Sequence, residues 1–136
     1  MLARKAAALL ATAAAVVVSV VVAPSASAHV PNRCSGWRVG VFDLNNYAGQ
    51  HACFNSGSGD LRQFALNNRI SSAWSHDTVP WCLYDDFSFR VPFSQMAPGG
   101  HYPVFAAFAT NRASSIQRGA CPAGFGVLPE PGVSVS

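Results

Sequence analysis

The chain has 136 residues, with nine basic and six acidic side chains and a formal net charge of +3. Two of the basic residues lie within the first five positions, and the other seven, all Arg, stand against five Asp and one Glu, which leaves the rest of the chain at about +1. No stripe of Lys and Arg remains there, so the electrostatic footprint of a nucleic-acid-binding protein is excluded.

The first 28 residues have the features of a signal peptide. Two basic residues begin it, residues 6–22 form an uncharged apolar run, and the ASA sequence at 26–28 is a small-residue cleavage site. The alternative is a single membrane anchor, because the apolar run approaches the ~20 residues that span a bilayer. The Ala-rich composition and the cleavage site favour removal. We therefore expect a secreted, extracellular protein that begins at His29 and has no membrane contact after cleavage.

A six-residue motif occurs twice in the mature chain. The sequence NNRISS at 67–72 returns as TNRASS at 110–115, 43 residues later. Each copy follows a segment with an aromatic residue, an acid, three further residues and a second aromatic, at 42–47 and 84–89. Repetition at such a period indicates a duplicated structural unit, so we expect one motif at about 38–75 and a second at about 81–118.

Four cysteines in an exported chain of about 108 residues predict two disulfides, because a domain this small gains from covalent cross-links. Three pairings are possible. One cross-link per repeat unit favours Cys34 with Cys53 and Cys82 with Cys121. A zinc site is the alternative, but no C-x-x-C or H-x-x-x-H spacing supports it. Its ligands would be His51, Cys53, Cys82 and His101.

Short alternating segments between Gly, Asn, Ser and Pro clusters predict β-strands, and no window keeps helical periodicity over three turns. Residues 61–66 could instead form one helical turn, since their apolar residues fall at i, i+3 and i+5. We expect the domain to span 29–121 and residues 122–136 to be a flexible tail. The predicted strands are 38–42, 50–54, 61–66 and 70–74 in the first unit and 81–84, 90–93, 102–108 and 113–117 in the second.

These two units resemble the βγ-crystallins. The segment with Phe42, Tyr47 and Gly49 is similar to the folded hairpin of that superfamily, and the NNRISS motif is similar to its calcium motif, N/D-N/D-x-x-S/T-S. The resemblance covers 39–117 and implies an all-β, βγ-crystallin-like sandwich of two Greek-key motifs, cross-linked by disulfides. In the second unit Val91 replaces the hairpin Gly and Thr110 replaces the first Asn, so we expect that hairpin to be more open or bulged.

The same resemblance implies two calcium sites, each with ligands from both six-residue motifs, 67–72 and 110–115, which we call the bends. Calcium takes six to eight oxygens, and these bends offer amides, hydroxyls and carbonyls close together, with an acid nearby. Because the bends are neutral, binding should be weak, with dissociation constants of about 10⁻⁴ to 10⁻³ M. The alternative is that the hydroxyls close the Greek key without an ion. The candidate ligands are Asp43, Asn67, Asn68, Arg69, Ser71, Asp85, Thr110, Asn111, Arg112 and Ser114.

Catalytic chemistry has little support in the sequence. Asp85 and Asp86 are adjacent on a predicted strand and should point to opposite faces. The four His are scattered, and neither G-x-S-x-G nor H-E-x-x-H is present. The three Trp are expected mainly in the core rather than on a carbohydrate-binding face. We expect no enzyme and no cofactor other than calcium.

A small exported crystallin-like protein with two disulfides also resembles the secreted bacterial metalloproteinase inhibitors. That likeness implies a monomeric peptidase inhibitor whose partner is a secreted metallopeptidase. A rigid domain would present an ordered loop to the enzyme, which reduces the ordering cost of binding, and the candidate loops are 94–100 and 75–80. The alternative is a calcium-binding extracellular module with a structural, stress or antagonistic role and no protease target.

Overall fold

The computed structural model describes residues 32–128 and 130–132, so the predicted signal peptide lies outside the described residues. Within these ranges the chain forms strands and short 3-10 helices, and no α-helix. No helix there is long and apolar enough to cross a membrane. The strands are β1 (Val39–Leu44), β2 (Ala48–Phe54), β3 (Gly57–Ser58), β4 (Ser72–Ser75), β5 (Trp81–Asp86), β6 (Arg90–Met96), β7 (His101–Tyr102) and β8 (Ser115–Arg118). The 3-10 helices are η2 (Asn32–Cys34), η3 (Asn45–Tyr47) and η4 (Leu61–Phe64).

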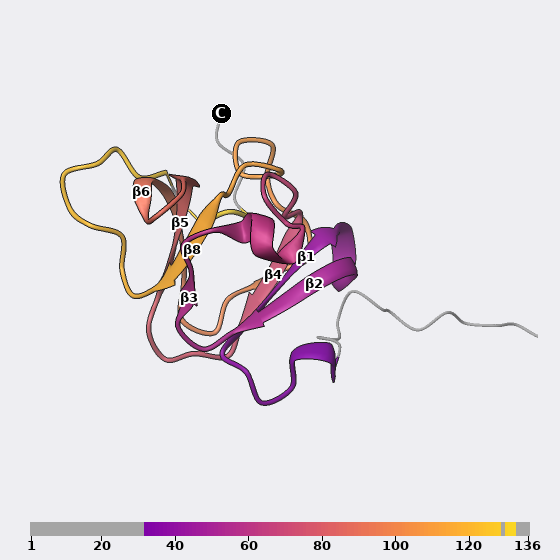
Figure 1. Cartoon of the computed structure of the whole chain (residues 1–136). Coiled ribbons are helices and arrows are strands. Elements are labelled where there is room, and N and C mark those ends of the chain that lie inside the picture. The colour runs from indigo at the N-terminus through magenta and orange to yellow at the C-terminus, as the bar shows by residue number, and fades with distance from the viewer. Residues whose placement is uncertain (1–31, 129, 133–136) are drawn as a thin grey trace, which may run out of the picture.

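The strands form two antiparallel four-stranded sheets, ordered β2-β1-β4-β7 and β3-β8-β5-β6 (Figure 1). Strands β1 to β4 come from the first predicted unit and β5 to β8 from the second. The third strand of each unit pairs in the sheet of the other unit, because β3 lies against β8 and β7 lies against β4. The predicted all-β sandwich of two Greek-key motifs is confirmed.

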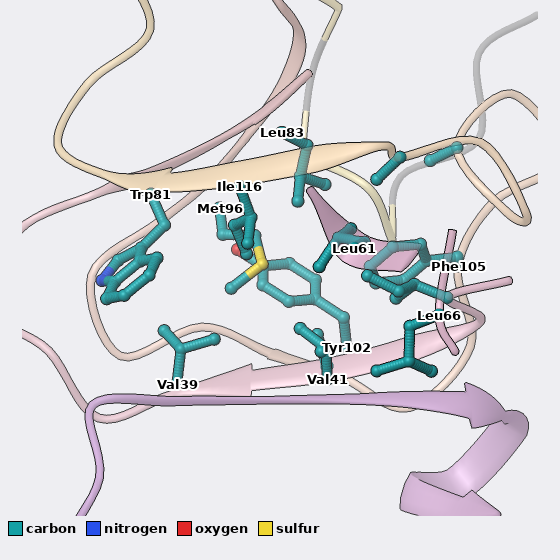
Figure 2. Close-up of a cluster of buried hydrophobic side chains, with 14 of the residues drawn as sticks. Val39, Val41, Leu61, Leu66, Trp81, Leu83, Met96, Tyr102, Phe105 and Ile116 are labelled. Atoms are coloured by element: carbon teal, nitrogen blue, oxygen red, sulfur yellow. The ribbon is translucent and has the colours of Figure 1, made fainter. Parts of the chain in front are cut away.

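The main core lies between the two sheets. In β1 the side chains of Val39 and Val41 point inward, and in β5 those of Trp81 and Leu83 do the same from the opposite sheet (Figure 2). All four are fully buried. This period-two alternation leaves the residues between them for the outer faces. Each large apolar side chain buried here contributes roughly 1.5–3 kcal/mol to folding.

A second apolar cluster covers the outer face of the first sheet, where Phe42, Tyr47 and Trp74 pack against the Cys34–Cys53 disulfide. Gly40 makes this packing possible. A Cβ at this position would lie 2.9 Å from Cys34 Sγ and 3.1 Å from the Trp74 ring. Trp74 in this cluster and Trp81 in the main core are buried, as expected from the sequence. Trp37 is exposed.

The structure differs from the predicted strands at three places. Residues 61–66 are not a strand: Asp60 Oδ1 accepts a hydrogen bond from Arg62 N at 3.0 Å and starts η4, which ends at Ala65 with φ +59°. The predicted loop at 55–60 contains the short strand β3, and the predicted strand at 102–108 is reduced to β7. β3 and β7 are the strands that pair in the sheet of the other unit. With two residues each, they are too short to show an alternation of apolar and polar residues.

Residues 127–128 and 130–132 lie against the domain, so the prediction of a flexible tail does not describe them. Leu128 forms an isolated parallel bridge with Ser94, and its N–H donates to Phe93 O at 2.9 Å. Further along, the Tyr102 hydroxyl donates to the Glu130 carboxylate, and Pro131 is fully buried. The last four residues lie outside the described part.

Candidate functional site

The two repeated bends lie side by side. Asn68 N donates to Ala113 O and Asn111 N donates to Ile70 O, both at 2.9 Å. The side chains cross in the same way. The hydroxyl of Ser71 lies 3.2 Å from Asn111 Oδ1, and that of Ser114 lies 3.4 Å from Asn68 Oδ1. The structure therefore brings together hydroxyls and amides that the sequence assigns to two shared sites.

The geometry of the bends and hairpins repeats about a pseudo-twofold axis. Asn68 and Asn111 both have φ +57°, a left-handed conformation that Asn tolerates better than most residues. Ser71 N donates to Phe42 O at 2.8 Å, and Ser114 N donates to Tyr84 O at 2.9 Å. Each bend is thus fixed to the hairpin of its own unit and faces the bend of the other.

The last serine of each motif closes its hairpin. Ser72 Oγ donates to Leu44 O at 2.6 Å and accepts from Tyr47 N at 3.0 Å. Ser115 Oγ repeats both bonds, to Asp86 O at 2.6 Å and from Phe89 N at 3.1 Å. Both serines are fully buried, so each hydroxyl satisfies one backbone donor and one acceptor that would otherwise be left unpaired.

The two acids placed near the bends are paired with arginines. Arg69 Nη2 lies 2.8 Å from Asp43 Oδ2. Arg112 binds Asp85 through two hydrogen bonds of 3.0 and 3.1 Å, with its guanidinium over the Phe93 ring at 4.3 Å. The sequence predicted Arg69 and Arg112 to supply carbonyl oxygens, but their side chains neutralise the carboxylates that were expected to attract calcium.

The hydroxyl and amide oxygens of the two bends are of the kind that calcium binds. Two oxygens that occupy adjacent positions about 2.4 Å from one Ca²⁺ are roughly 3.4 Å apart. Ser71 Oγ lies 3.2 Å from Asn111 Oδ1 and 3.3 Å from Thr110 Oγ1, so three such oxygens meet at one bend. The enclosed Asn67 Oδ1 has no hydrogen-bond partner among the described residues. One set would use Ser71, Thr110 and Asn111, and the other Ser114 and Asn68.

The second hairpin folds back as tightly as the first. The Phe42 and Tyr47 rings are 5.7 Å apart, and so are the equivalent Tyr84 and Phe89 rings. Both hairpins contain a register shift, so the second hairpin has the expected irregularity, but it is not more open than the first. Val91 adopts φ +60° where Gly49 has φ +82°, and the exposed Val side chain points away from the core.

The alternative sites weighed from the sequence are not formed. The disulfides join Cys34 to Cys53 and Cys82 to Cys121, as the repeat favoured, and no free cysteine remains in the described chain. Asp85 and Asp86 face different arginines, Arg112 and Arg90.

Two of the three histidines in the described ranges lie close together. The rings of His76 and His101 are 5.8 Å apart, and burial, followed by the neighbouring His76, lowers the pKa of His101.

One buried ionic cluster was missed in the sequence. Asp77 lies in the linker between the two units, with its side chain only 3% exposed. It accepts hydrogen bonds from Arg118 at 2.6 and 2.9 Å and from Trp81 Nε1 at 2.8 Å. The Arg118 guanidinium, helped by the Trp81 and Thr78 N–H groups, holds the pKa of Asp77 far below its ordinary value, against the effect of burial. A single Asp in a polar linker gives no pattern that distinguishes it from an ordinary turn residue.

The most exposed long loop follows β8, and we call residues 119–127 the C-terminal loop. It projects from the side of the molecule in Figure 1. Residues 122–126 are all exposed. By contrast, the predicted loops contain buried positions, including Ser75 and Asp77 in one and Ser94 and Met96 in the other. A hollow of about 420 Å³ beside the C-terminal loop is lined in part by Gln95, Cys121, Phe125 and Leu128.

Comparison with known proteins agrees with this architecture. Residues 27–92 match the family described as peptidase inhibitor family I36. A βγ-crystallin from Ciona intestinalis is 21% identical with a TM-score of 0.52, and covers 60% of this chain and 98% of its own. A βγ-crystallin domain from Flavobacterium johnsoniae is 19% identical with a TM-score of 0.52, and covers 63% and 97%. No curated protein matches the sequence. The resemblance seen in the motifs is thereby confirmed, and these structures establish the fold alone.

Proposed function

We propose that this chain, which matches peptidase inhibitor family I36 over residues 27–92 and has a βγ-crystallin-like fold, is a secreted inhibitor of an extracellular metallopeptidase. The family match is the observation that carries the proposal. The fold adds a physical reason, because two disulfides and two interlocked sheets hold the exposed loops on a rigid support. A loop that is ordered before binding loses less conformational entropy when the enzyme captures it. The protein acts by occupying the cleft, and it is not itself an enzyme.

The test is titration of a thermolysin-like metallopeptidase with the protein expressed from the full chain, secreted and oxidised. We expect loss of peptidase activity at micromolar protein or below, with a one-to-one end point. The same protein after reduction and alkylation of both disulfides is the control, and it should inhibit poorly because the support is lost. Unchanged peptidase activity at micromolar oxidised protein would remove the metallopeptidase proposal.

A second proposed property is weak calcium binding at the paired bends, as in an extracellular structural module. The crossing of Ser71 with Asn111 and of Ser114 with Asn68 favours it. The pairing of both acids with arginines limits the affinity, because little negative charge remains to offset the dehydration of the ion.

Thermal melting in millimolar calcium and in chelator measures this property. A site filled at 100 times its dissociation constant would add ~2.7 kcal/mol to the free energy of unfolding. Because 1 mM calcium is about one to ten times the expected dissociation constant, we predict a smaller rise, of about 0.4–1.4 kcal/mol for each filled site. Equal melting temperatures in both buffers, together with no heat of binding by calorimetry, would contradict calcium binding.

A further inference from the structure

We propose that the C-terminal loop is the segment that enters the peptidase cleft, with Phe125 as its main contact. This inference rests on the proposed inhibitor function and adds the contact surface and the kind of peptidase. The loop lies beyond the part of the chain that matches the inhibitor family, so the proposal is carried by the geometry of these residues.

The C-terminal loop is held at both ends. At its start, Gly119 N donates to Pro80 O at 2.7 Å, and Cys121 is joined to Cys82 in β5 by a disulfide. Cys121 N also donates to Gln95 Oε1 at 2.8 Å. At its end, Leu128 is fixed to β6 through Phe93 O. The exposed residues between Cys121 and Leu128 are thus confined before any partner binds, which reduces the entropy cost of association.

The tip of the loop carries Phe125, which also lines the hollow beside the loop together with Gln95 and Leu128. Phe125 is 53% exposed, which makes it the most exposed aromatic side chain among the described residues. It stands between Gly124 and Gly126, and a Cβ added at either glycine would meet no atom within 4 Å. The two glycines carry no side chains that would block the approach of an enzyme to Phe125.

The composition of the loop identifies the class of peptidase. Residues 119–128 contain no charged side chain, so the loop offers nothing to an enzyme that selects basic or acidic residues. A single aromatic side chain at the tip suits a pocket for large apolar side chains beside the catalytic centre. The partner is therefore a peptidase with an apolar specificity pocket.

Inhibition constants of two variants test the proposal. Phe125→Ala removes the proposed contact, and Trp37→Ala removes an aromatic side chain that is 45% exposed and lies in the other part of the domain. The test enzymes are thermolysin and chymotrypsin. Trypsin, whose specificity pocket is acidic, is the comparison enzyme. We expect Phe125→Ala to raise the inhibition constant about 30-fold, the effect of losing a central anchor, and Trp37→Ala to change it less than twofold. Unchanged melting temperatures check that both variants are folded.

The outcomes separate the two proposals. If the unmodified protein inhibits and Phe125→Ala inhibits equally well, the loop assignment is overturned and the inhibitor function stands. If the unmodified protein inhibits trypsin better than the other two enzymes, the apolar-pocket assignment is overturned. If it inhibits none of the three, the inhibitor function fails and this inference falls with it. Hydrogen exchange of the complex gives a second readout, since protection should appear at 119–128; protection confined to 75–80 or 94–100 would contradict the proposal.

Discussion

At the scale of single residues, neighbouring serines in each bend have different partners. Ser72 bonds to two backbone groups of its own hairpin, whereas Ser71 faces a side chain of the opposite bend. The sequence showed that both hydroxyls could close the loop, but it could not assign one to the hairpin and the other to the shared site. That assignment depends on the strand register, which places Ser72 opposite Phe42.

Ser72→Ala should destabilise the fold far more than Ser71→Ala. The first substitution leaves Leu44 O and Tyr47 N without their buried partner, at a cost of about 2–3 kcal/mol in the free energy of unfolding. The second removes a hydroxyl whose partner, Asn111, is exposed to water, so we expect a loss of less than about 1 kcal/mol. Urea unfolding of both variants measures this difference. Equal losses would show that Ser71 is as important for folding as Ser72.

The arginines of the bends show a different limit of prediction at this scale. Arg69 follows Asp43 by 26 residues and Arg112 follows Asp85 by 27, so the sequence repeats an acid and a base at nearly the same separation. That repeated pair of opposite charges was a usable signal for two ion pairs.

At the scale of elements, the longer strands were predictable and the exchanged ones were not. β1 and β5 alternate clearly and carry the inward pairs Val39 with Val41 and Trp81 with Leu83. β3 and β7 have two residues each, and their positions are set by the strands of the other unit. Likewise, the docking of the segment around Leu128 depends on a tertiary contact with β6 that no local pattern contains.

The two hairpins allow a reciprocal test of the glycine position. Gly49→Val should be strongly destabilising, by about 2 kcal/mol or more, because the residue has φ +82° and its Cβ would lie 2.0 Å from Asp43 Oδ1. Val91→Gly should stabilise the protein by up to about 1 kcal/mol, since the left-handed conformation costs Val more than the entropy that Gly loses. Thermal melting of both variants is the measurement. A stabilising Gly49→Val would contradict the requirement for Gly in this turn.

At the scale of the whole molecule, the buried Asp77 connects the linker between the units to the end of β8. Arg118 and the Trp81 N–H both donate hydrogen bonds to the Asp77 carboxylate, so removing its negative charge would weaken both interactions. Since Arg118 directly precedes the C-terminal loop, this cluster also positions the start of the proposed contact surface. A structural feature in the linker is thereby coupled to the surface that we propose to contact the peptidase.

Stability should fall in acid because of Asp77. Its pKa is lower in the folded protein than its ordinary value of about 3.9, so its contribution is complete at neutral pH and is lost as the pH falls below about 5. Denaturant unfolding between pH 7 and pH 2 measures this loss. Asp77→Asn should be less stable at pH 7 and should show a weaker decline in acid. Asp86→Asn, in a more exposed pair with Arg90, is the control and should keep the decline. An identical decline in Asp77→Asn would contradict this role.

The exchange of β3 and β7 between the sheets has a consequence for how the chain could be divided. Each disulfide lies within one half, so a cut in the linker near Thr78 would leave no covalent bond between the halves. Neither fragment could complete a sheet alone, because each has given one strand away and needs one in return. The separate fragments should be poorly structured, yet they should reassemble when mixed into a two-chain form of the same domain without a covalent link between the halves.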